Sequence, residues 1–318
     1  MSVADFTGLS VADQLLRLRE REEGMGGEHM CDLVEMVEAF RSKLRDASSP
    51  EILRLLSKTI EGPEVRDDHS YWSCVSELHR RSDPCIFEAC VAWVGAVVPR
   101  ARVAGADVLS QLGYARGYPF AAQSCPVLER LLGDPEPTVV AAALIALGHL
   151  RCGNLSLIAS RVGSSDVNIR LAIVHALLAR NELLARQTLV ELSRDAEVEV
   201  RNWATFALGA GSTYDDPAVR EALLARLSDK DDETRGEALV GLAERKDSRV
   251  LTAIAEELAL SDVGDPAIEA ATRMPHASLL PALEGLLRAR PDDLSVRMAI
   301  EACRSAKAST TAPGPGSW

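Results

Sequence analysis

Three side chains in the N-terminal third of the chain could together bind a metal ion. His79, Cys85 and Cys90 are of the types that hold zinc. Cys85 and Cys90 lie five residues apart, however, whereas residues on one helix face lie three or four apart. No C-x-x-C pair occurs, and the cysteines lack the spacing of a disulfide framework: Cys31, Cys74, Cys85, Cys90, Cys125, Cys152 and Cys303. We therefore expect buried free thiols, no metal site and no cofactor.

Motifs for phosphate binding and nucleophilic catalysis are missing from the sequence. It contains neither G-x-x-x-x-G-K-[ST] nor G-x-G-x-x-G, and it has no G-x-S-x-G elbow. The histidines form no ligand set at metal spacing. We predict no catalytic residues and a protein that is not an enzyme.

Composition and charge exclude some classes of partner. The 35 Lys and Arg residues against 47 Asp and Glu residues give a formal net charge of −12. A general nucleic-acid binder needs a basic surface, so nucleic acid is disfavoured as a partner. The acidity is concentrated between residues 215 and 265, where fourteen acids accompany seven Lys or Arg residues. We interpret this window as a solvated face that could also attract a basic partner protein.

The N-terminus and the hydrophobic pattern indicate a cytoplasmic protein. MSVADFTGLSVADQ has neither a basic stretch nor an apolar one, so it does not resemble a secretory signal. No stretch approaches 18 uninterrupted apolar residues, so no membrane span is expected. Ser10, followed three residues later by Asp13, predicts the start of a helix.

A repeat organises most of the chain. Its segments share an Arg or apolar residue, a small or apolar residue three positions later, and a small–Leu pair at positions six and seven. The clearest copies are RVAGADVLSQLG from Arg102, VAAALIALGHL from Val140, RLAIVHALL from Arg170, RNWATFALG from Arg201 and RGEALVGLA from Arg235. A weaker copy begins at Arg297, and the spacing of the copies is near 31 residues. This spacing suits one helical hairpin per repeat, and stacked hairpins bury a continuous core.

An acidic residue precedes five of the six anchors by four positions. The anchors and their acids are Glu136/Val140, Asp166/Arg170, Glu197/Arg201, Asp231/Arg235 and Asp293/Arg297. An acid at a helix start caps free N–H groups and faces the positive end of the helix dipole. At this spacing it also shares a face with the arginine, so we expect a cap and an intrahelical pair.

Second amphipathic segments lie between the anchors and complete the hairpins. Leu, Ile or Val recur at three- and four-residue spacing in 121–132, 155–162, 186–192, 218–227, 249–260 and 278–288. Gly-, Asp- and Pro-containing turns separate them from the anchor helices. The pattern predicts an all-α solenoid of stacked antiparallel helical hairpins that form a curved superhelix.

The frame R-x-x-A-x-x-A-L-G, followed by a turn and a Leu-rich helix, resembles the HEAT-repeat family. Its period is most similar to the short bacterial HEAT-like repeats first grouped with phycobilisome lyases, and the likeness runs from about Arg100 to Arg297. The resemblance implies a non-catalytic scaffold or adaptor that binds a partner protein on its concave surface. In such stacks the second helices line that side, which implies these contact residues: Arg220, Glu221, Arg226, Glu256, Glu257, Glu284 and Arg288.

Two enzymatic alternatives follow from the same resemblance. Alkylpurine DNA glycosylases of this architecture use Trp, Asp and Arg in a basic groove, and Trp203, Asp195 and Arg201 could suggest such an arrangement in a nucleic-acid-binding or glycosylase-like protein. The neighbouring segment 151–201 is nearly neutral. Trp203 stands beside the small Ala204, which favours packing between repeats. A bilin lyase is the other alternative, although no residue marks a bilin site.

The chain is expected to fall into three parts. Residues 1–98 form a divergent helical cap, since the frame fades there while amphipathic segments continue. Residues 99–304 form the repeat solenoid, and residues 305–318, without apolar periodicity, form a disordered tail.

Overall fold

The computed structural model describes residues 7, 9–23, 30–62, 68–178, 180–213 and 215–311. Every regular element within these ranges is a helix, and none of the residues in them forms a strand. The predicted all-α solenoid of helical hairpins is confirmed. The chain divides into two compact units, residues 1–161 (unit 1) and 162–318 (unit 2).

Unit 1 is built from paired helices around a leucine-rich core. Its elements are α2 (Val11–Glu23), α3 (Met30–Asp46), α4 (Ser49–Glu61), α5 (His69–His79), α6 (Pro84–Val94), α7 (Pro99–Gln111), the 3₁₀ turn η1 (Tyr114–Arg116), α8 (Ala121–Leu131), α9 (Pro137–His149) and α10 (Leu155–Ala159). The predicted start of α2 is confirmed, because Ser10 Oγ accepts the Asp13 N–H at 3.2 Å. Fully buried side chains such as Phe40, Leu78 and Leu144 fill the core.

The boundary between the units does not coincide with the expected boundary at residue 98. Helices α6 and α7, which lie before and after residue 98, pack closely against each other. A Cβ added to Gly105 in α7 would lie 2.9 Å from the Cys90 carbonyl oxygen of α6, so only glycine permits this approach. Helices α6 and α7 thus contact each other across residue 98, and the expected division into cap and solenoid stays a prediction.

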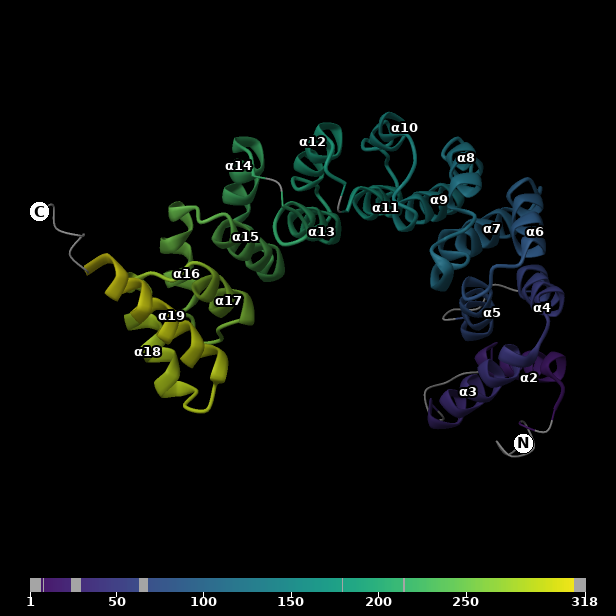
Figure 1. Cartoon of the computed structure of the whole chain (residues 1–318), viewed down its shortest axis with the longest axis horizontal. Helices are drawn as coiled ribbons and strands as arrows, with labels where there is room; N and C mark the ends of the chain where they lie inside the picture. Colours follow the sequence, from purple (N-terminus) through teal and green to yellow (C-terminus); the bar gives the residue numbers. More distant parts are fainter. Residues whose placement is uncertain are drawn as a thin grey trace, which may run out of the picture. The chain divides into compact units, whose positions relative to one another are not determined.

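Unit 2 continues the hairpins as two layers of helices. Layer A contains α11 (Val167–Leu177), α13 (Val198–Leu208), α15 (Asp232–Glu244), α17 (Asp265–Arg273) and α19 (Leu294–Thr311). Layer B contains α12 (Leu183–Leu192), α14 (Pro217–Arg226), α16 (Leu251–Glu257), which follows the 3₁₀ turn η2 (Ser248–Val250), and α18 (Leu280–Ala289), which follows η3 (Ala277–Leu279). Figure 1 shows α12 and α14 on one side of α13 and α15.

Layer A is the more closely packed of the two layers. Each of its helices contacts the next, whereas the layer B helices pack mainly on layer A. A Cβ added to Gly241 in α15 would lie 2.7 Å from Gly209 Cα, which follows α13. Helices of a bent stack lie closest on the inner side of the bend. The packing within unit 2 therefore favours layer A as the concave side, rather than the second helices as the sequence resemblance implied.

The anchor arginines before Arg297 each link their own repeat to the next one. Arg170 donates to both carboxylate oxygens of Asp195 at 2.7 and 2.9 Å, and to the Ser164 carbonyl oxygen at 2.9 Å. Asp195 in turn accepts the Glu197 N–H at 2.9 Å, just before α13. The guanidinium thus joins the turn before its own helix to the turn before the next layer A helix.

The same inter-repeat pair recurs along the chain. Arg102–Asp134 in unit 1, and Arg201–Asp229 and Arg235–Glu257 in unit 2, have shortest N–O distances of 2.7 to 2.8 Å. Each arginine also donates to carbonyl oxygens five and six residues before it. We call this series of pairs the arginine ladder. Its ion pairs join successive repeats within each unit.

The predicted role of the acid before each anchor is partly wrong. Asp166, Asp231 and Asp293 accept N–H groups of the first helical turn, as expected of caps. Glu136 and Glu197 make no such side-chain bond. The anchor arginines of the ladder pair with a carboxylate of the following repeat instead of the acid four residues back. For Arg102, Arg170 and Arg201 that carboxylate is an Asp that accepts both guanidinium bonds.

Two further expectations are corrected by the structure. Cys125 of α8 and Cys152 after α9 form a disulfide with a Cα–Cα distance of 6.2 Å, although free thiols were expected throughout. Cys74, Cys90 and Cys303 are free and buried as expected, Cys85 is free but exposed, and the side chain of Cys31 lies outside the described residues.

The C-terminal segment also differs from the expected tail. Helix α19 continues to Thr311, so residues 305–311 are helical. The stretch from Ser305 to Ala308 includes alanine and lysine, which favour helix. The rest of the expected tail, residues 312–318, lies outside the described residues. Among the helices that are described, none combines the length and the apolar character needed to cross a bilayer.

Candidate functional site

The structure gives the three possible metal ligands in unit 1 separate environments. His79 is buried with Nε2 2.8 Å from the Asp107 carbonyl oxygen, and burial lowers its pKa. Cys90 is buried and Cys85 is exposed. Among the described residues, no group of three or more His, Cys, Asp or Glu side chains could hold a metal ion.

The Trp203, Asp195 and Arg201 side chains do not form the arrangement that a glycosylase would need. Asp195 is bound by Arg170, whose hydrogen bonds hold the pKa of that carboxyl below its usual value. Arg201 is bound to Asp229. Both charged groups therefore belong to the arginine ladder, and neither is available to act beside the Trp203 ring.

Most of the predicted partner-binding residues already have intramolecular partners. Each of these five residues makes a short contact within the chain: Arg220 with Asp215 (2.6 Å), Glu221 with Arg249 (2.7 Å), Arg226 with the Ser193 carbonyl oxygen (3.0 Å), Glu257 with Arg235 (2.8 Å) and Glu284 with Arg304 (2.8 Å). Glu256 and Arg288 are exposed. All seven lie on layer B helices, where internal pairing neutralises much of the charge. Their role in binding stays a prediction.

An aromatic cluster lies on layer A instead, in which Trp203 is exposed while His175 and Phe206 are half-buried. The Trp203 ring of α13 lies 5.3 Å from the His175 ring of α11, measured between centroids, and 5.7 Å from Phe206 in an edge-on arrangement. The contact with His175 joins neighbouring repeats, as expected for Trp203. The Trp203 side chain is nevertheless 38% exposed, so it is a surface residue and not part of the core.

Carboxylates lie next to this cluster on the same layer. Glu199 is one turn before Trp203 on α13, and Glu233 of α15 accepts a hydrogen bond from Asn202 Nδ2 at 3.2 Å. Glu237 occupies the position in α15 that Trp203 occupies in α13, two residues after the anchor arginine. Its pKa is raised by burial and by the nearby charges of Glu269 and Glu233. We call His175, Glu199, Trp203, Phe206, Glu233 and Glu237 the Trp203 surface.

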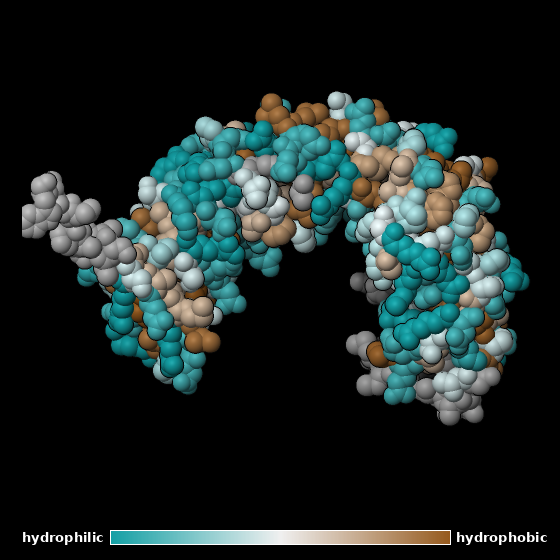
Figure 2. Space-filling view, in the orientation of Figure 1, coloured by the Kyte–Doolittle hydropathy of each residue, from teal (hydrophilic) through white to brown (hydrophobic). Residues whose placement is uncertain are grey.

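The surface of unit 2 has polar regions, although apolar side chains such as Leu183 and Leu294 are exposed elsewhere on it. Figure 2 shows mainly hydrophilic residues over α14 and α15. The aromatic cluster is thus a local apolar feature within a strongly charged unit. Packing of Trp203 between repeats was expected from the sequence, but its exposure was not. One signal pointed to the surface: a glutamate, Glu237, fills the equivalent position of the next repeat.

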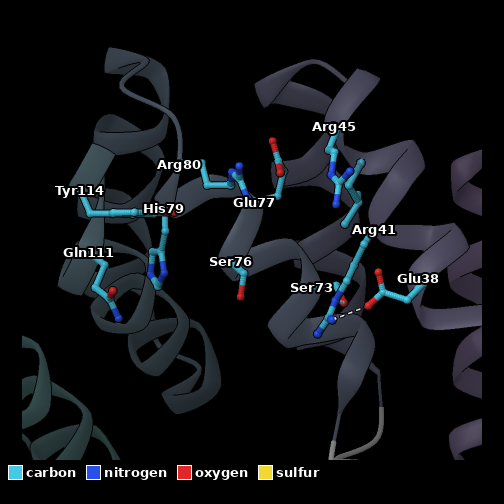
Figure 3. A pocket seen from close by; sticks show the side chains of 11 residues that line it. Glu38, Arg41, Arg45, Ser73, Ser76, Glu77, His79, Arg80, Gln111 and Tyr114 are labelled. Atoms are coloured by element: carbon cyan, nitrogen blue, oxygen red, sulfur yellow. Dashed lines mark hydrogen bonds and ion pairs between the residues drawn. The ribbon is translucent and has the colours of Figure 1, made fainter. Parts of the chain in front are cut away.

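Unit 1 contains a separate polar cavity of about 480 Å³. Figure 3 shows the side chains from α3, α5 and α7 that line it. Arg41 pairs with Glu38 at 2.9 Å and donates to Ser73, while Arg45 and Arg80 are exposed at its rim. Figure 3 shows these arginines spread along the cavity rather than directed at one point. The cavity therefore offers polar contacts but no convergent binding group.

Comparison with known proteins identifies the repeats in sequence. Residues 126–209 and 187–273 match the family model for HEAT repeats. Protein YibA of Escherichia coli K12 is 37% identical over 136 residues, which are 43% of this chain and 48% of YibA. YibA of the O157:H7 strain matches equally. The chain spans about half the length of the curated relatives it matches.

Solved structures share the architecture over a longer part of the chain. The X-ray structure of E. coli YibA matches with a TM-score of 0.69 at 24% identity, covering 84% of this chain and 96% of that one. Kap95p, in a structure that describes its binding to RanGDP, matches with a TM-score of 0.56 at 12% identity, over 93% of this chain and 45% of Kap95p. At these identities the likeness shows the fold alone.

Proposed function

Because residues 126–273 of the chain are HEAT repeats, we propose that the protein is a non-catalytic scaffold that binds a partner protein on layer A of unit 2. The observation that carries this proposal is the aromatic cluster around the exposed Trp203 beside the carboxylates of α15. Exposed tryptophan is enriched at protein interfaces, because it offers a large contact area with little loss of side-chain entropy.

The arginine ladder supports a binding role for layer A. The ladder uses carboxylates in the turns between helices to fix one repeat against the next. Side chains of α13 and α15 that face solvent, such as Trp203 and Glu233, take no part in these ladder pairs and can contact another molecule. The fold is shared with Kap95p, whose structure concerns its binding to RanGDP, and scaffold binding by stacked helices is consistent with that likeness.

Nucleic-acid binding is the weaker candidate. Binding to phosphates requires unpaired cations, but within unit 2 Arg170, Arg186 and Arg201 are paired with Asp195, Asp216 and Asp229. The segment that was nearly neutral in sequence therefore presents few available cations. This pairing disfavours the glycosylase-like alternative as well.

Affinity capture with the full chain tests the proposed function. Tagged protein is incubated with native lysate that has or has not been treated with nuclease, and bound proteins are identified by mass spectrometry. We expect a protein that survives nuclease treatment and binds the purified chain directly when it is itself purified. Capture of nucleic acid alone, or of no protein that binds directly after purification, would overturn the scaffold proposal.

A further inference from the structure

The Trp203 surface combines an aromatic part and an acidic part on one helix layer. In its aromatic part the partly exposed Trp203 ring lies near the rings of His175 and Phe206. Its acidic part brings Glu233 and Glu237 one helical turn apart on α15, with Glu269 of α17 close enough to act on the charge of Glu237. Neither Glu199 nor Glu237 has an ion-pair partner among the described residues.

We propose that the Trp203 surface binds a basic segment of the partner protein, in which an arginine or lysine side chain lies against the Trp203 ring with its charge next to Glu233 and Glu237. This inference rests on the proposed scaffold function and names the surface and the chemistry of the partner. A cation over an aromatic ring is attracted by the ring's electron density. Nearby carboxylates then provide the charge-assisted hydrogen bonds that orient it.

The charges on α15 and α17 explain why the partner segment is basic and not apolar or acidic. The carboxylate of Glu237 is partly desolvated and is repelled by the negative charges of Glu269 and Glu233, and both effects raise its pKa. A cation relieves that repulsion, whereas an apolar side chain would bury the carboxylates without a partner. An anionic segment or a phosphate backbone would be repelled.

The arginines of α15 and α17 are paired with carboxylates other than Glu237. Arg235, the anchor arginine of α15, is bound to Glu257 and Asp232. Arg273 of α17 is bound to Glu244 and Glu269. Glu269 is therefore already paired with Arg273. Glu237 has no ion-pair partner among the described residues and is the centre of the proposed site.

Fluorescence anisotropy with defined peptides tests the proposal on the full chain. The probes are fluorescein-labelled arginine-rich peptides that contain leucine and serine, and matched peptides in which each arginine is replaced by neutral citrulline. We expect the arginine peptides to bind more tightly than the citrulline peptides, and to weaken as salt is added. Equal binding of both peptide sets, or no binding of either, would overturn the proposal.

Paired variants locate the binding on the chain. Glu233→Gln combined with Glu237→Gln removes two charges from the surface, whereas Glu191→Gln combined with Glu301→Gln removes two charges from exposed positions outside the Trp203 surface. We expect about tenfold weaker binding for the first pair and unchanged binding for the second. Equal weakening by both pairs would show a general effect of net charge and would contradict the assignment.

A substitution at the ring separates the aromatic contribution from folding. Trp203→Leu keeps an apolar side chain but removes the ring, and Trp203→Phe restores an aromatic face. We expect a loss of about 2- to 30-fold for the leucine variant and partial recovery for phenylalanine, with circular dichroism spectra unchanged. Identical affinities for the two variants would refute the role of the ring.

The identified partner distinguishes this inference from the proposed function. If a captured partner binds the wild-type chain and the Glu233→Gln/Glu237→Gln variant equally, the scaffold function stands and the surface assignment is wrong. If the partner binds the wild-type chain and loses affinity only with this variant, the two proposals stand together. If no protein binds the chain directly, the scaffold proposal is overturned whatever the peptides show.

Discussion

The arginine ladder makes a quantitative prediction about stability, and Asp195 is the most informative place to test it. The Asp195 side chain is 8% exposed and its partner Arg170 is 15% exposed, so the pair is largely removed from water. It joins two successive repeats through both carboxylate oxygens. Loss of the carboxylate would leave the Arg170 guanidinium partly buried without its counter-ion.

The magnitude follows from the burial of the pair. Exposed ion pairs contribute about 0–1 kcal/mol, whereas breaking a buried pair by removing one partner costs about 3–5 kcal/mol. Arg170 keeps its bond to the Ser164 carbonyl oxygen, so the cost of Asp195→Asn lies between these limits, at about 2–3 kcal/mol. The asparagine oxygen can still accept the Glu197 N–H, which separates the loss of charge from the loss of the turn.

Urea denaturation followed by circular dichroism measures this cost, with Glu269→Gln as the matched control. Glu269 pairs with Arg273, but the two side chains are 48% and 39% exposed, so we expect a cost below about 1 kcal/mol. A double-mutant cycle with Arg170→Gln should show a coupling energy of about 2 kcal/mol. Additive effects, or equal costs for Asp195→Asn and Glu269→Gln, would refute the view that the ladder holds the repeats together.

Three further predictions concern pH and the disulfide. Hydrogen bonds from Arg170 lower the folded-state pKa of Asp195. The carboxylate therefore adds to the free energy of unfolding above the unfolded pKa of about 3.9, and this contribution is lost as pH falls below that value. Asp195→Asn should flatten that part of a plot of unfolding free energy against pH. Burial and neighbouring carboxylates raise the pKa of Glu237, so its charged form destabilises the fold at pH 7. Glu237→Gln should therefore raise the melting temperature at pH 7, and this gain should vanish below about pH 4, where the carboxyl is protonated in both states. An equal gain at both pH values would show that the charge of Glu237 is not the cause. Cys152→Ser should destabilise unit 1 by about 3.5 kcal/mol, because the disulfide closes a separation of 27 residues; an unchanged urea midpoint in oxidised protein would contradict it.

The repeat frame made the architecture predictable from sequence. The small–Leu pairs face the core, as the burial of Leu147, Leu177, Leu208 and Leu242 shows, and a period near 31 residues leaves room for only one hairpin per repeat. Packing of this kind repeats in sequence because every unit buries the same face. The hairpin stack could therefore be inferred without the structure.

The ladder and the disulfide were not recognised because they depend on distance through space. The ladder does have a sequence signal, an Asp two residues before the acid that precedes the anchor, in Asp134-x-Glu136, Asp195-x-Glu197 and Asp229-x-Asp231. Choosing this Asp over the nearer acid required knowledge of where the next turn lies. Cys125 and Cys152, in contrast, are separated by a whole helix, and no spacing rule connects them.

The predicted contact residues illustrate how far fold analogy extends. Glu257 and Arg226 are on the helices that the resemblance indicated, but each already has a partner within the chain. Trp203 belongs to a helix that the frame located correctly, while its exposure depends on what the neighbouring repeat places beside it. Helix positions follow from periodicity, whereas the free surface follows from which charges are already paired.

Site-specific photo-crosslinking tests the central claim most directly. A photoreactive amino acid replaces Phe206 on the Trp203 surface, or Glu191 on layer B as the matched position, and crosslinked peptides are identified by mass spectrometry in native lysate. We predict that position 206 crosslinks to an arginine- or lysine-rich segment of one partner protein and that position 191 does not. Crosslinks to that partner only from position 191, or no protein crosslink from position 206, would contradict the account.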